Sequence, residues 1–368
     1  MKLAERLNEK RILIWGFGRE GKAILNFIRY HCTGCRVDVA DSREMSLPEG
    51  ALRFLHCPAG EVPPVAEYDL VFKSPGIVLD GLDPEEQKHV TSLTQVFLET
   101  YRDQVIGVTG TKGKSTTSSL IAHILKEGGK KAILLGNIGL PCVDFVDQIH
   151  EDTLIVFELS CHQLETLTVS PHVAVFLNLY PDHLDHYHSF EAYARAKERI
   201  AAFQGPSDAV IIGEQVLLSG YCGMARENGS RLIVACNENA SGEDGVILRP
   251  EEADINVRKN VILLKKSARI LSEEEGAESL IIRREDTKLP GFHNVYNIAV
   301  AYEICRNLYG ISREQCLRAL ASFRGLRHRL EWVGCYGGVD YYDDSISTVC
   351  ETSIAAVESI ERAKTLIL

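Results

Sequence analysis

A glycine-rich segment at residues 108–117, with the sequence VTGTKGKSTT, holds the residue types most suited to chemistry. It follows an apolar run at 105–108 and precedes a helical pattern at 118–125. A strand, a tight glycine turn, Lys-Ser and a helix together form a phosphate-binding loop. Backbone N–H groups and the helix N-terminus hold phosphate oxygens, the lysine offsets their charge, and the serine hydroxyl reaches Mg²⁺. The segment therefore predicts binding of a nucleoside triphosphate. The alternative is an ordinary surface loop, because Val108 stands where the general pattern has its first glycine.

The ends of two further apolar runs carry side chains that could complete such a site. The run at 154–157 ends at Glu158, and the run at 173–178 leads to His183. Each residue alone is more often a satisfied polar group than a ligand. Strand ends that converge beside a phosphate loop favour the other interpretation, a carboxylate and an imidazole that hold Mg²⁺. Lys197 lies in an expected helix at 189–200, where the sequence alone predicts a solvated lysine.

The N-terminal third has the pattern of a nucleotide-binding unit. An expected strand at 11–15 runs into Gly16, Gly18 and a helix at 22–28, and a second strand ends at Asp41. Glycines allow close backbone approach, the helix end favours a diphosphate, and the acid suits a ribose hydroxyl. The same geometry accepts any nucleotide diphosphate, so NAD and a UDP-linked molecule both remain open.

A third strand, expected at 69–73, leads to the turn Ser74-Pro75-Gly76. Ligands bind at such strand ends in α/β sheets, and a simple loop is the alternative. Further apolar segments at 209–212, 231–234 and 260–264 predict strands that complete the central part of the chain, and the acidic tract at 273–275 predicts a solvated loop.

Composition limits the class of protein. The chain has 368 residues, 45% of them hydrophobic and 25% charged, which suits two or three globular domains. A net charge of −11 argues against a general nucleic-acid binder, so anionic ligands would need local cations and helix ends.

Cysteine usage and hydropathy predict where the chain works. Eleven cysteines are scattered without a disulfide framework, and no signal peptide or bilayer-spanning apolar run is present. We therefore expect a reduced, cytoplasmic setting with no membrane contact. The pair Cys32 and Cys35 has no second pair at zinc spacing, which favours an incidental occurrence.

Taken together and in this order, the motifs resemble the Mur ligases, ATP-dependent enzymes that build the peptidoglycan stem peptide. The residues that carry the resemblance are TGTKGKS at 109–115, GNIG at 136–139, ELSCHQLE at 158–165, Asn178 with DHLD at 182–185, LPGFHNVYN at 289–297 and FRGLRHRLE at 323–331. The N-terminal glycines with Asp41, Arg43 and Ser74-Pro75-Gly76 are similar to the MurD-like branch, which joins glutamate to UDP-N-acetylmuramoyl-L-alanine. The resemblance covers essentially the whole chain.

The resemblance implies an α/β fold of three domains. A Rossmann-like domain at 1–101 would bind the UDP-linked substrate, and a central P-loop ATPase domain with a mostly parallel sheet would occupy 102–325. Residues 326–368 would begin a Rossmann-like domain that binds the amino acid. The family continues well beyond this point, so we expect a truncated ligase whose last residues, 363–368, form a strand.

The resemblance also implies roles for individual residues. The catalytic group would be Lys114, Lys197, His183 and Glu158. ATP would contact Gly110, Thr111, Lys112, Gly113, Lys114, Ser115, Thr116, Asn294, Asn297, Arg329 and Asp344. Two Mg²⁺ ions would be held by Ser115, Glu158, His183 and Lys197, the last carbamylated. The muramoyl substrate and its UDP would contact Gly16, Gly18, Asp41, Arg43, Ser74, Asn137, Ser160, Gln163 and Thr348.

The implied reaction is amide-bond formation through an acyl phosphate, with UDP-N-acetylmuramoyl-L-alanine and glutamate as substrates and a monomer as the working form. D-Glutamate ligases usually have Lys at the position of Ile346, and the pattern at 342–348 resembles a branch associated with L-glutamate. D-Glutamate is favoured, with L-glutamate as the alternative. Two other hypotheses remain open. One is an NAD-dependent oxidoreductase built on residues 16–21, which leaves the phosphate loop unexplained, and the other is a non-catalytic nucleotide-binding module.

Overall fold

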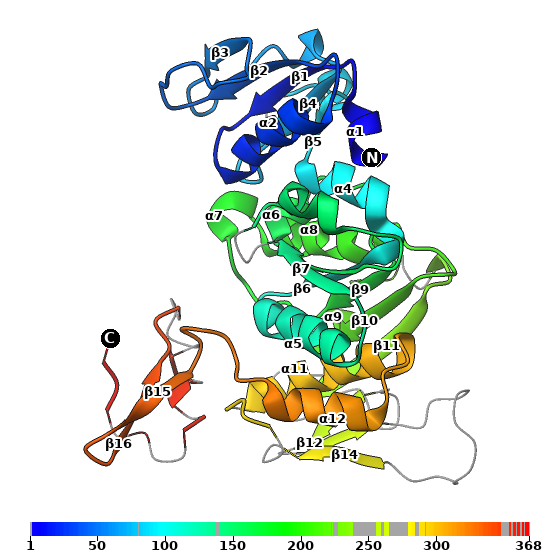
Figure 1. Cartoon of the computed structure of the whole chain (residues 1–368), viewed down its shortest axis with the longest axis vertical. Coiled ribbons are helices and arrows are strands. Elements are labelled where there is room, and N and C mark those ends of the chain that lie inside the picture. Colours follow the sequence, from blue (N-terminus) through cyan, green and yellow to red (C-terminus); the bar gives the residue numbers. More distant parts are fainter. Residues whose placement is uncertain are drawn as a thin grey trace.

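The computed structural model consists of two α/β units stacked end to end and a β-hairpin beside the second unit (Figure 1). The residues that the structure describes are 2–79, 81–136, 140–221, 223, 227–237, 255–258, 261–264, 279–283, 287–290, 292–346, 353–354, 356–357, 359–360, 363 and 365–367. No helix within these ranges is both long and apolar enough to span a membrane.

The first unit is built on a five-stranded parallel sheet with the order β3-β2-β1-β4-β5. Its central strand carries Ile12, Leu13 and Ile14, which are fully buried because helices and loops cover both faces. Gly21 lets helix α2 approach this strand, since a Cβ there would lie 2.4 Å from the carbonyl oxygen of Gly16. The elements are α1 (Lys2–Leu7), β1 (Arg11–Trp15), α2 (Arg19–His31), β2 (Arg36–Asp41), β3 (Arg53–His56), η1 (Val65–Glu67), β4 (Leu70–Lys73), α3 (Pro84–Gln87) and β5 (Val90–Thr91).

The second unit is built on a nine-stranded sheet with the order β14-β13-β12-β11-β10-β9-β6-β8-β7. Strands β6 to β12 pair in parallel, whereas β13 pairs antiparallel with both β12 and β14 at one edge. The strands are β6 (Val105–Thr109), β7 (Ala132–Gly136), β8 (Leu154–Glu158), β9 (Val173–Phe176), β10 (Ala209–Gly213), β11 (Arg231–Asn237), β12 (Ile255–Arg258), β13 (Val261–Leu264) and β14 (Ser279–Arg283).

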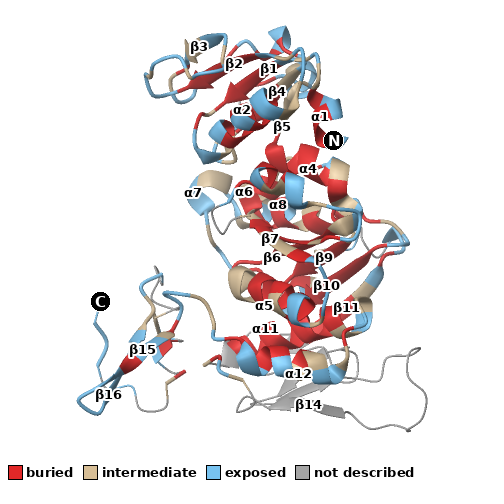
Figure 2. Cartoon of the chain, in the orientation of Figure 1, coloured by how far each residue is buried: buried red, intermediate tan, exposed pale blue. Residues whose placement is uncertain are grey.

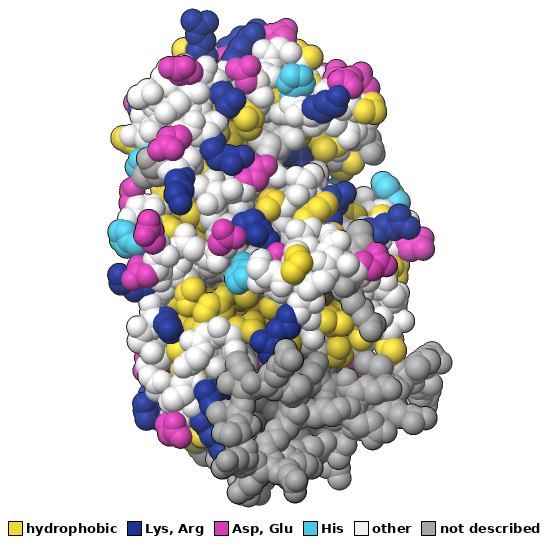
Figure 3. Space-filling model, turned by 90° about the vertical axis from the view of Figure 1, so that its right-hand side faces the viewer, with side chains coloured by type: hydrophobic (Ala, Val, Ile, Leu, Met, Phe, Trp, Pro, Cys, Tyr) yellow, Lys and Arg dark blue, Asp and Glu magenta, His cyan; other side chains and the backbone are white. Residues whose placement is uncertain are grey.

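Helices cover both faces of this sheet and enclose its core (Figure 2). Helices α5, α11 and α12 pack together on one face, and α4, α6 and α8 lie on the other. These elements are α4 (Leu93–Tyr101), η2 (Arg102–Gln104), α5 (Lys114–Glu127), η3 (Cys142–Gln148), α6 (Cys161–Leu164), α7 (Leu184–Tyr187), α8 (Phe190–Ala202), α9 (Glu214–Leu218), α11 (Phe292–Glu303), the π-helical segment η7 (Ile304–Leu308) and α12 (Arg313–Ser322). On the face drawn in Figure 3, acidic and basic side chains are interspersed, and hydrophobic side chains gather near its middle.

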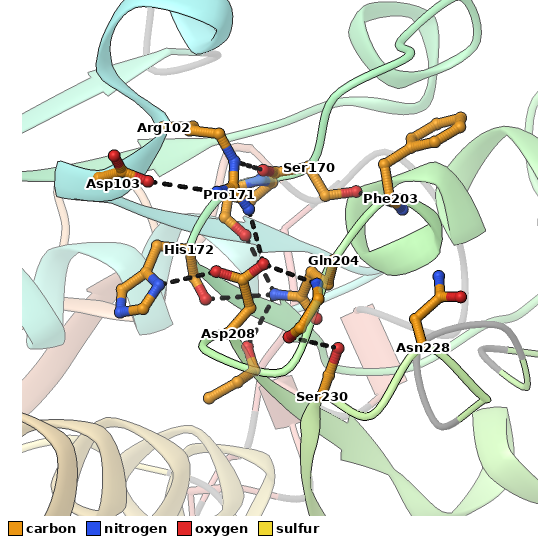
Figure 4. Close-up of polar contacts among 12 residues, drawn as sticks. Arg102, Asp103, Ser170, Pro171, His172, Phe203, Gln204, Asp208, Asn228 and Ser230 are labelled. Carbon is orange, nitrogen blue, oxygen red and sulfur yellow. Dashed lines mark hydrogen bonds and ion pairs between the residues drawn. The ribbon is translucent and has the colours of Figure 1, made fainter.

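The amino ends of the central strands are tied together by a partly buried polar network (Figure 4). Asp208 accepts hydrogen bonds from Arg102 at 2.6 Å and from the backbone N–H of Gly205 at 2.8 Å, and it lies 2.8 Å from Nδ1 of His172. Gln204 donates to the carbonyl oxygen of Pro171 at 3.0 Å. Burial alone would raise the pKa of Asp208, but these donors hold the pKa below its ordinary value. The network lies at the edge opposite the phosphate loop, so it positions the strands and leaves their carboxyl ends for chemistry.

A two-stranded hairpin, β15 (Glu331–Tyr336) and β16 (Val339–Asp343), stands apart from both sheets (Figure 1). Its apolar side chains are largely exposed, and the side chain of Trp332 is 58% exposed. The prediction of a strand at 363–368 is wrong for the described residues of that segment, which have no regular structure. The physical reason is that a strand needs a hydrogen-bonded neighbour, and no described strand pairs with this segment.

The remaining expected strands and the helix at 189–200 are confirmed, with ends shifted by a few residues. The sequence therefore predicted the α/β class and the mostly parallel central sheet correctly. The acidic tract at 273–275 lies outside the described residues.

Candidate functional site

The phosphate loop joins β6 to α5 in a conformation that requires glycine. Gly113 is the N-cap of α5 and has φ of +84°, and a Cβ there would lie 2.6 Å from Oδ1 of Asn297. The loop is fixed from outside by Asn178, which accepts the backbone N–H of Lys112 at 2.8 Å and donates to the carbonyl oxygen of the same residue at 3.0 Å. The first N–H groups of α5 have no carbonyl within the helix to accept them. They therefore point at a place suited to phosphate oxygens.

Lys114 folds back over the loop that it follows. Its Nζ donates to the carbonyl oxygens of Gly110 at 3.0 Å and Thr111 at 3.1 Å. Burial lowers the pKa of Lys114, and the carboxylate of Glu158 opposes that shift. The amine is thus a weakly solvated cation, which gains more from a bound anion than an exposed lysine would.

Lys197 reaches the same loop from the other side. The residue is 1% exposed, its Nζ donates to the carbonyl oxygen of Gly110 at 2.9 Å, and the amine lies 5.0 Å from the ring centroid of Tyr193. Burial, followed by repulsion from Lys114, lowers the pKa of Lys197 to about 7. The prediction of a solvated lysine is therefore wrong. The helix packs its 193–197–200 face against the sheet, so this lysine points inward.

Glu158 and His183 follow the two strands on either side of β6, Glu158 as the last residue of β8 and His183 seven residues after the end of β9 at Phe176. Glu158 ends β8, is 2% exposed and is close enough to raise the pKa values of both Lys114 and Lys197. His183 precedes α7 with φ of +52°, a strained backbone conformation for a non-glycine residue, and its ring lies 5.2 Å from the ring of His162. Backbone strain of this kind is typical of functional sites.

Residues far along the chain also reach the loop. Asn297 accepts a hydrogen bond from Thr117 Oγ1 at 3.1 Å and donates to Oδ1 of Asn294 at 3.1 Å. Arg329 donates to Ser115 Oγ at 3.2 Å. Asp344 accepts the N–H of Leu330 at 2.8 Å, which holds the segment that carries the arginine. The structure therefore brings these expected nucleotide residues to the phosphate loop or to the segment that contacts it.

The expected substrate residues of the first unit form one connected turn. Asp41 accepts hydrogen bonds from the backbone N–H groups of Phe17 at 2.6 Å and Arg43 at 2.9 Å, and from Nε of Arg43 at 3.0 Å. Burial would raise the pKa of Asp41, but these donors, Arg43 foremost, hold it at about 2. Ser74 Oγ donates to the carbonyl oxygen of Gly16 at 2.9 Å. The carboxylate of Asp41 therefore also shapes the glycine turn, in addition to any contact with a ribose.

Ser160 and Gln163 form a capping box that begins α6, and Gln163 Nε2 donates to Glu20 of the first unit at 3.4 Å. Gly18 is the N-cap of α2, with open space where a Cβ would lie. Asn137 and Thr348 lie outside the described residues.

Comparison with known proteins decides the family. Residues 108–305, more than half of the chain, match the Mur ligase middle domain. The chain belongs to the Mur ligase family. A UDP-N-acetylmuramoylalanine--D-glutamate ligase of Koribacter versatilis is 30% identical over 98% of this chain and 77% of its own length. A ligase of the same name from Pelotomaculum thermopropionicum is 32% identical over 95% of this chain and 74% of its own length.

Solved Mur ligase structures share the fold. MurF from Acinetobacter baumannii superposes with a TM-score of 0.54 at 18% identity, covering 95% of this chain and 70% of its own. MurC from Thermotoga maritima gives a TM-score of 0.51 at 20% identity, covering 95% and 77% of the two chains. At these identities the likeness shows the fold alone.

Sequence reasoning did not assign roles to several polar residues of this Mur ligase site. Lys73 is buried and its Nζ lies 2.6 Å from Oε1 of Glu165, which joins the end of β4 to the end of α6. His162 and His186 lie with their ring centroids 4.4 Å apart. The sequence signal that could have found His186 is its spacing of three residues from His183, because residues three apart share one face of a helix. No sequence signal pairs Lys73 with Glu165, because Lys73 ends a strand of the first unit and Glu165 ends a helix of the second.

Proposed function

We propose that this Mur ligase uses ATP to join glutamate to UDP-N-acetylmuramoyl-L-alanine, the amide-forming step named in its curated relatives. The observation that carries the proposal is the pair of buried amines of Lys114 and Lys197, which share the carbonyl oxygen of Gly110. The weakly solvated cation of Lys114 at a helix N-terminus fits a polyanionic substrate, and the buried amine of Lys197 supplies the site of the proposed carbamate.

Mg²⁺ suits the donors that surround this loop. The buried carboxylate of Glu158 and the hydroxyl of Ser115 are the hard oxygen ligands that Mg²⁺ prefers, and His183 adds an imidazole. Mg²⁺ bound there would offset charge on the transferring phosphoryl group.

Carbamylation of Lys197 is part of the proposal. A carbamate forms only on an uncharged amine, and a pKa of about 7 leaves much of Lys197 uncharged at neutral pH. The product is an anion with two oxygen atoms, which would attract a second Mg²⁺ and pair with the neighbouring cation of Lys114.

The reaction begins with phosphoryl transfer. The terminal carboxylate of the UDP-linked substrate attacks the γ-phosphorus atom of ATP, ADP leaves, and an acyl phosphate forms. Lys114 and the first N–H groups of α5 stabilise the charge that develops on the phosphate oxygens. The amine of glutamate then attacks the acyl carbon, loses a proton, and displaces inorganic phosphate to leave the amide bond.

Substrate placement follows from the two units. The turn held by Asp41, Arg43 and Ser74 lies at the carboxyl ends of a parallel sheet, where α/β proteins bind nucleotide diphosphates. We propose that it holds the UDP group, with Ser160 and Gln163 facing the muramoyl part. We also propose D-glutamate as the amino acid, a monomer as the working form in the cytoplasm, and domain divisions at residues 101 and 325.

Phosphate release tests the proposal. The chain is given ATP, Mg²⁺, UDP-N-acetylmuramoyl-L-alanine and either enantiomer of glutamate. We expect release that depends on the muramoyl substrate and is faster with D-glutamate, and faster release with L-glutamate would reverse that assignment. Lys114→Ala should lower the rate by about 10²–10³-fold or more, whereas the exposed Lys126→Ala should retain it. Wild-type rates in Lys114→Ala would overturn the role of the loop.

A further inference from the structure

A cluster of metal-binding side chains lies between α6 and α7, beside the residues assigned to ATP and Mg²⁺. His162, Glu165 and His186 each offer one ligand atom, and these three atoms lie within 4.8 Å of one another. Nε2 of His186 is 3.1 Å from Oε2 of Glu165, and the two imidazole rings meet edge to face with centroids 4.4 Å apart. All three side chains are partly exposed, so a dissolved ion can reach them.

The carboxylate of this cluster is held in place by its neighbours. Lys73 donates to Oε1 of Glu165 at 2.6 Å, and the other oxygen, Oε2, faces Nε2 of His186. Tyr187 donates to Oε2 at 3.1 Å and lies 3.4 Å from Nδ1 of His162. Hydrogen bonds that orient ligating groups in this way are typical of built metal sites.

We propose that His162, Glu165 and His186 bind a divalent cation of the zinc class. Two imidazoles and one carboxylate are ligands that Zn²⁺ accepts, with a water molecule as the fourth ligand. A tetrahedral ion about 2.0–2.1 Å from each ligand places neighbouring ligand atoms about 3.3 Å apart, close to the observed distance between His186 and Glu165. Mg²⁺ is disfavoured here because it prefers a shell of oxygen atoms.

An overlapping group, Cys161 with His162 and His183, meets the same distance limit. It is the weaker candidate for two reasons. Cys161 is almost fully buried, and His183 is already assigned to the Mg²⁺ of the proposed reaction. The group with Glu165 has a carboxylate fixed by Lys73 and two ligand atoms near tetrahedral separation.

A bound ion would have a structural consequence for the active site. Helix α7 has four residues, too few for an isolated helix to be stable, and His183 immediately precedes it. An ion shared by His186 of α7 and His162 of α6 would fasten the short helix to its neighbour. The site goes beyond the proposed ligase reaction and does not depend on it.

Direct metal titration of the full chain tests the site. After chelation and removal of bound metals, Co²⁺ and Zn²⁺ are added in the presence of excess Mg²⁺, and binding is measured from the visible absorption of tetrahedral cobalt and by competition with a chromophoric chelator. We expect one ion per chain. His162→Gln and His186→Gln should each weaken binding by at least 10-fold.

His328→Gln is the matched control, because His328, Glu331 and Asp343 form another three-residue group on the exposed hairpin. It should leave the affinity of the wild type unchanged. Zn²⁺ should also raise the thermal midpoint of the wild type and of His328→Gln but not that of His186→Gln. Absence of tetrahedral cobalt would overturn the site. Binding that survives His186→Gln, or that is lost in His328→Gln, would also overturn it. Loss of binding in Cys161→Ser would do the same, because the ion would then require the thiol of Cys161.

Discussion

Replacement of Lys197 by Met should stabilise this protein at acidic pH while it removes the proposed carbamate. The pKa of Lys197 falls from an ordinary value of 10.5 to about 7 because the amine is buried and faces Lys114. Each tenfold change in the protonation equilibrium corresponds to about 1.4 kcal/mol. The charged amine therefore lowers the free energy of unfolding by about 5 kcal/mol. Loss of the hydrogen bond from Lys197 to the carbonyl oxygen of Gly110 lowers the stability of the variant by only about 1 kcal/mol, since Lys114 also donates to that oxygen.

The pH dependence has a definite sign. Below pH of about 7 both folded and unfolded chains hold the proton, so the full cost applies. Between about 7 and 10.5 the unfolded chain binds a proton that the folded chain lacks, so the stability of the wild type rises with pH. The gain from Lys197→Met should therefore be about 4 kcal/mol at pH of about 6 and about 1 kcal/mol at pH of about 9.

Urea unfolding in buffers free of carbon dioxide measures this difference at both pH values. Lys126→Met, at an exposed lysine of α5, is the control and should show no pH-dependent change. Added bicarbonate near pH 8 should stabilise the wild type and leave Lys197→Met unchanged, because only an uncharged amine forms a carbamate. A stability difference that stays constant from acid to alkaline pH would refute the assignment of a buried, readily deprotonated lysine.

Three other perturbations have predicted outcomes. Gly113→Ala places a Cβ at φ of +84° and 2.6 Å from Asn297, so it should cost about 1–2 kcal/mol of stability and weaken ATP binding in calorimetry. Lys73→Met leaves the carboxylate of Glu165 without its buried cation and should lower stability by about 3 kcal/mol in urea unfolding, whereas adding Glu165→Leu should restore part of the loss. Asp208→Asn should cost about 2–3 kcal/mol at neutral pH. Since the pKa of Asp208 is lowered, this loss should vanish as the pH falls below the carboxyl range, and a deficit that persists in acid would contradict it.

The sequence predicted those parts of the site that depend on local patterns. The strand-loop-helix unit at 105–127 follows from its glycines and from apolar runs on both sides, and the structure contains it. The strand end at Glu158 follows from the same kind of pattern, because neighbouring parallel strands end at one edge, whereas His183 lies in the segment between β9 and α7. The roles expected for individual residues in binding ATP, Mg²⁺ and substrate stay predictions.

Other features depended on contacts that no local pattern encodes. Lys197 was expected in solvent because lysines on helices usually are, but Tyr193, Lys197 and Ile200 share one buried face of α8. The sequence shows that these residues share one face of a helix, but it does not show that this face packs against the sheet. The ion pair of Lys73 and Glu165 joins strand β4 of the first unit to the end of α6 in the second, so its existence depends on how the units pack.

Under the proposed function, the site also explains how a chain with a net charge of −11 would bind a polyanion. Lys114 and Lys197 both donate to the carbonyl oxygen of Gly110, and burial lowers both pKa values. Without an anion, this arrangement is costly, because two amines compete for one acceptor inside the protein. A triphosphate supplies the missing counter-charge, and a carbamate on Lys197 would release Gly110 to Lys114 and turn a repelling neighbour into an attracting one. Under the proposed function, the geometry that lowers the stability of the free protein would thus favour the binding of a triphosphate.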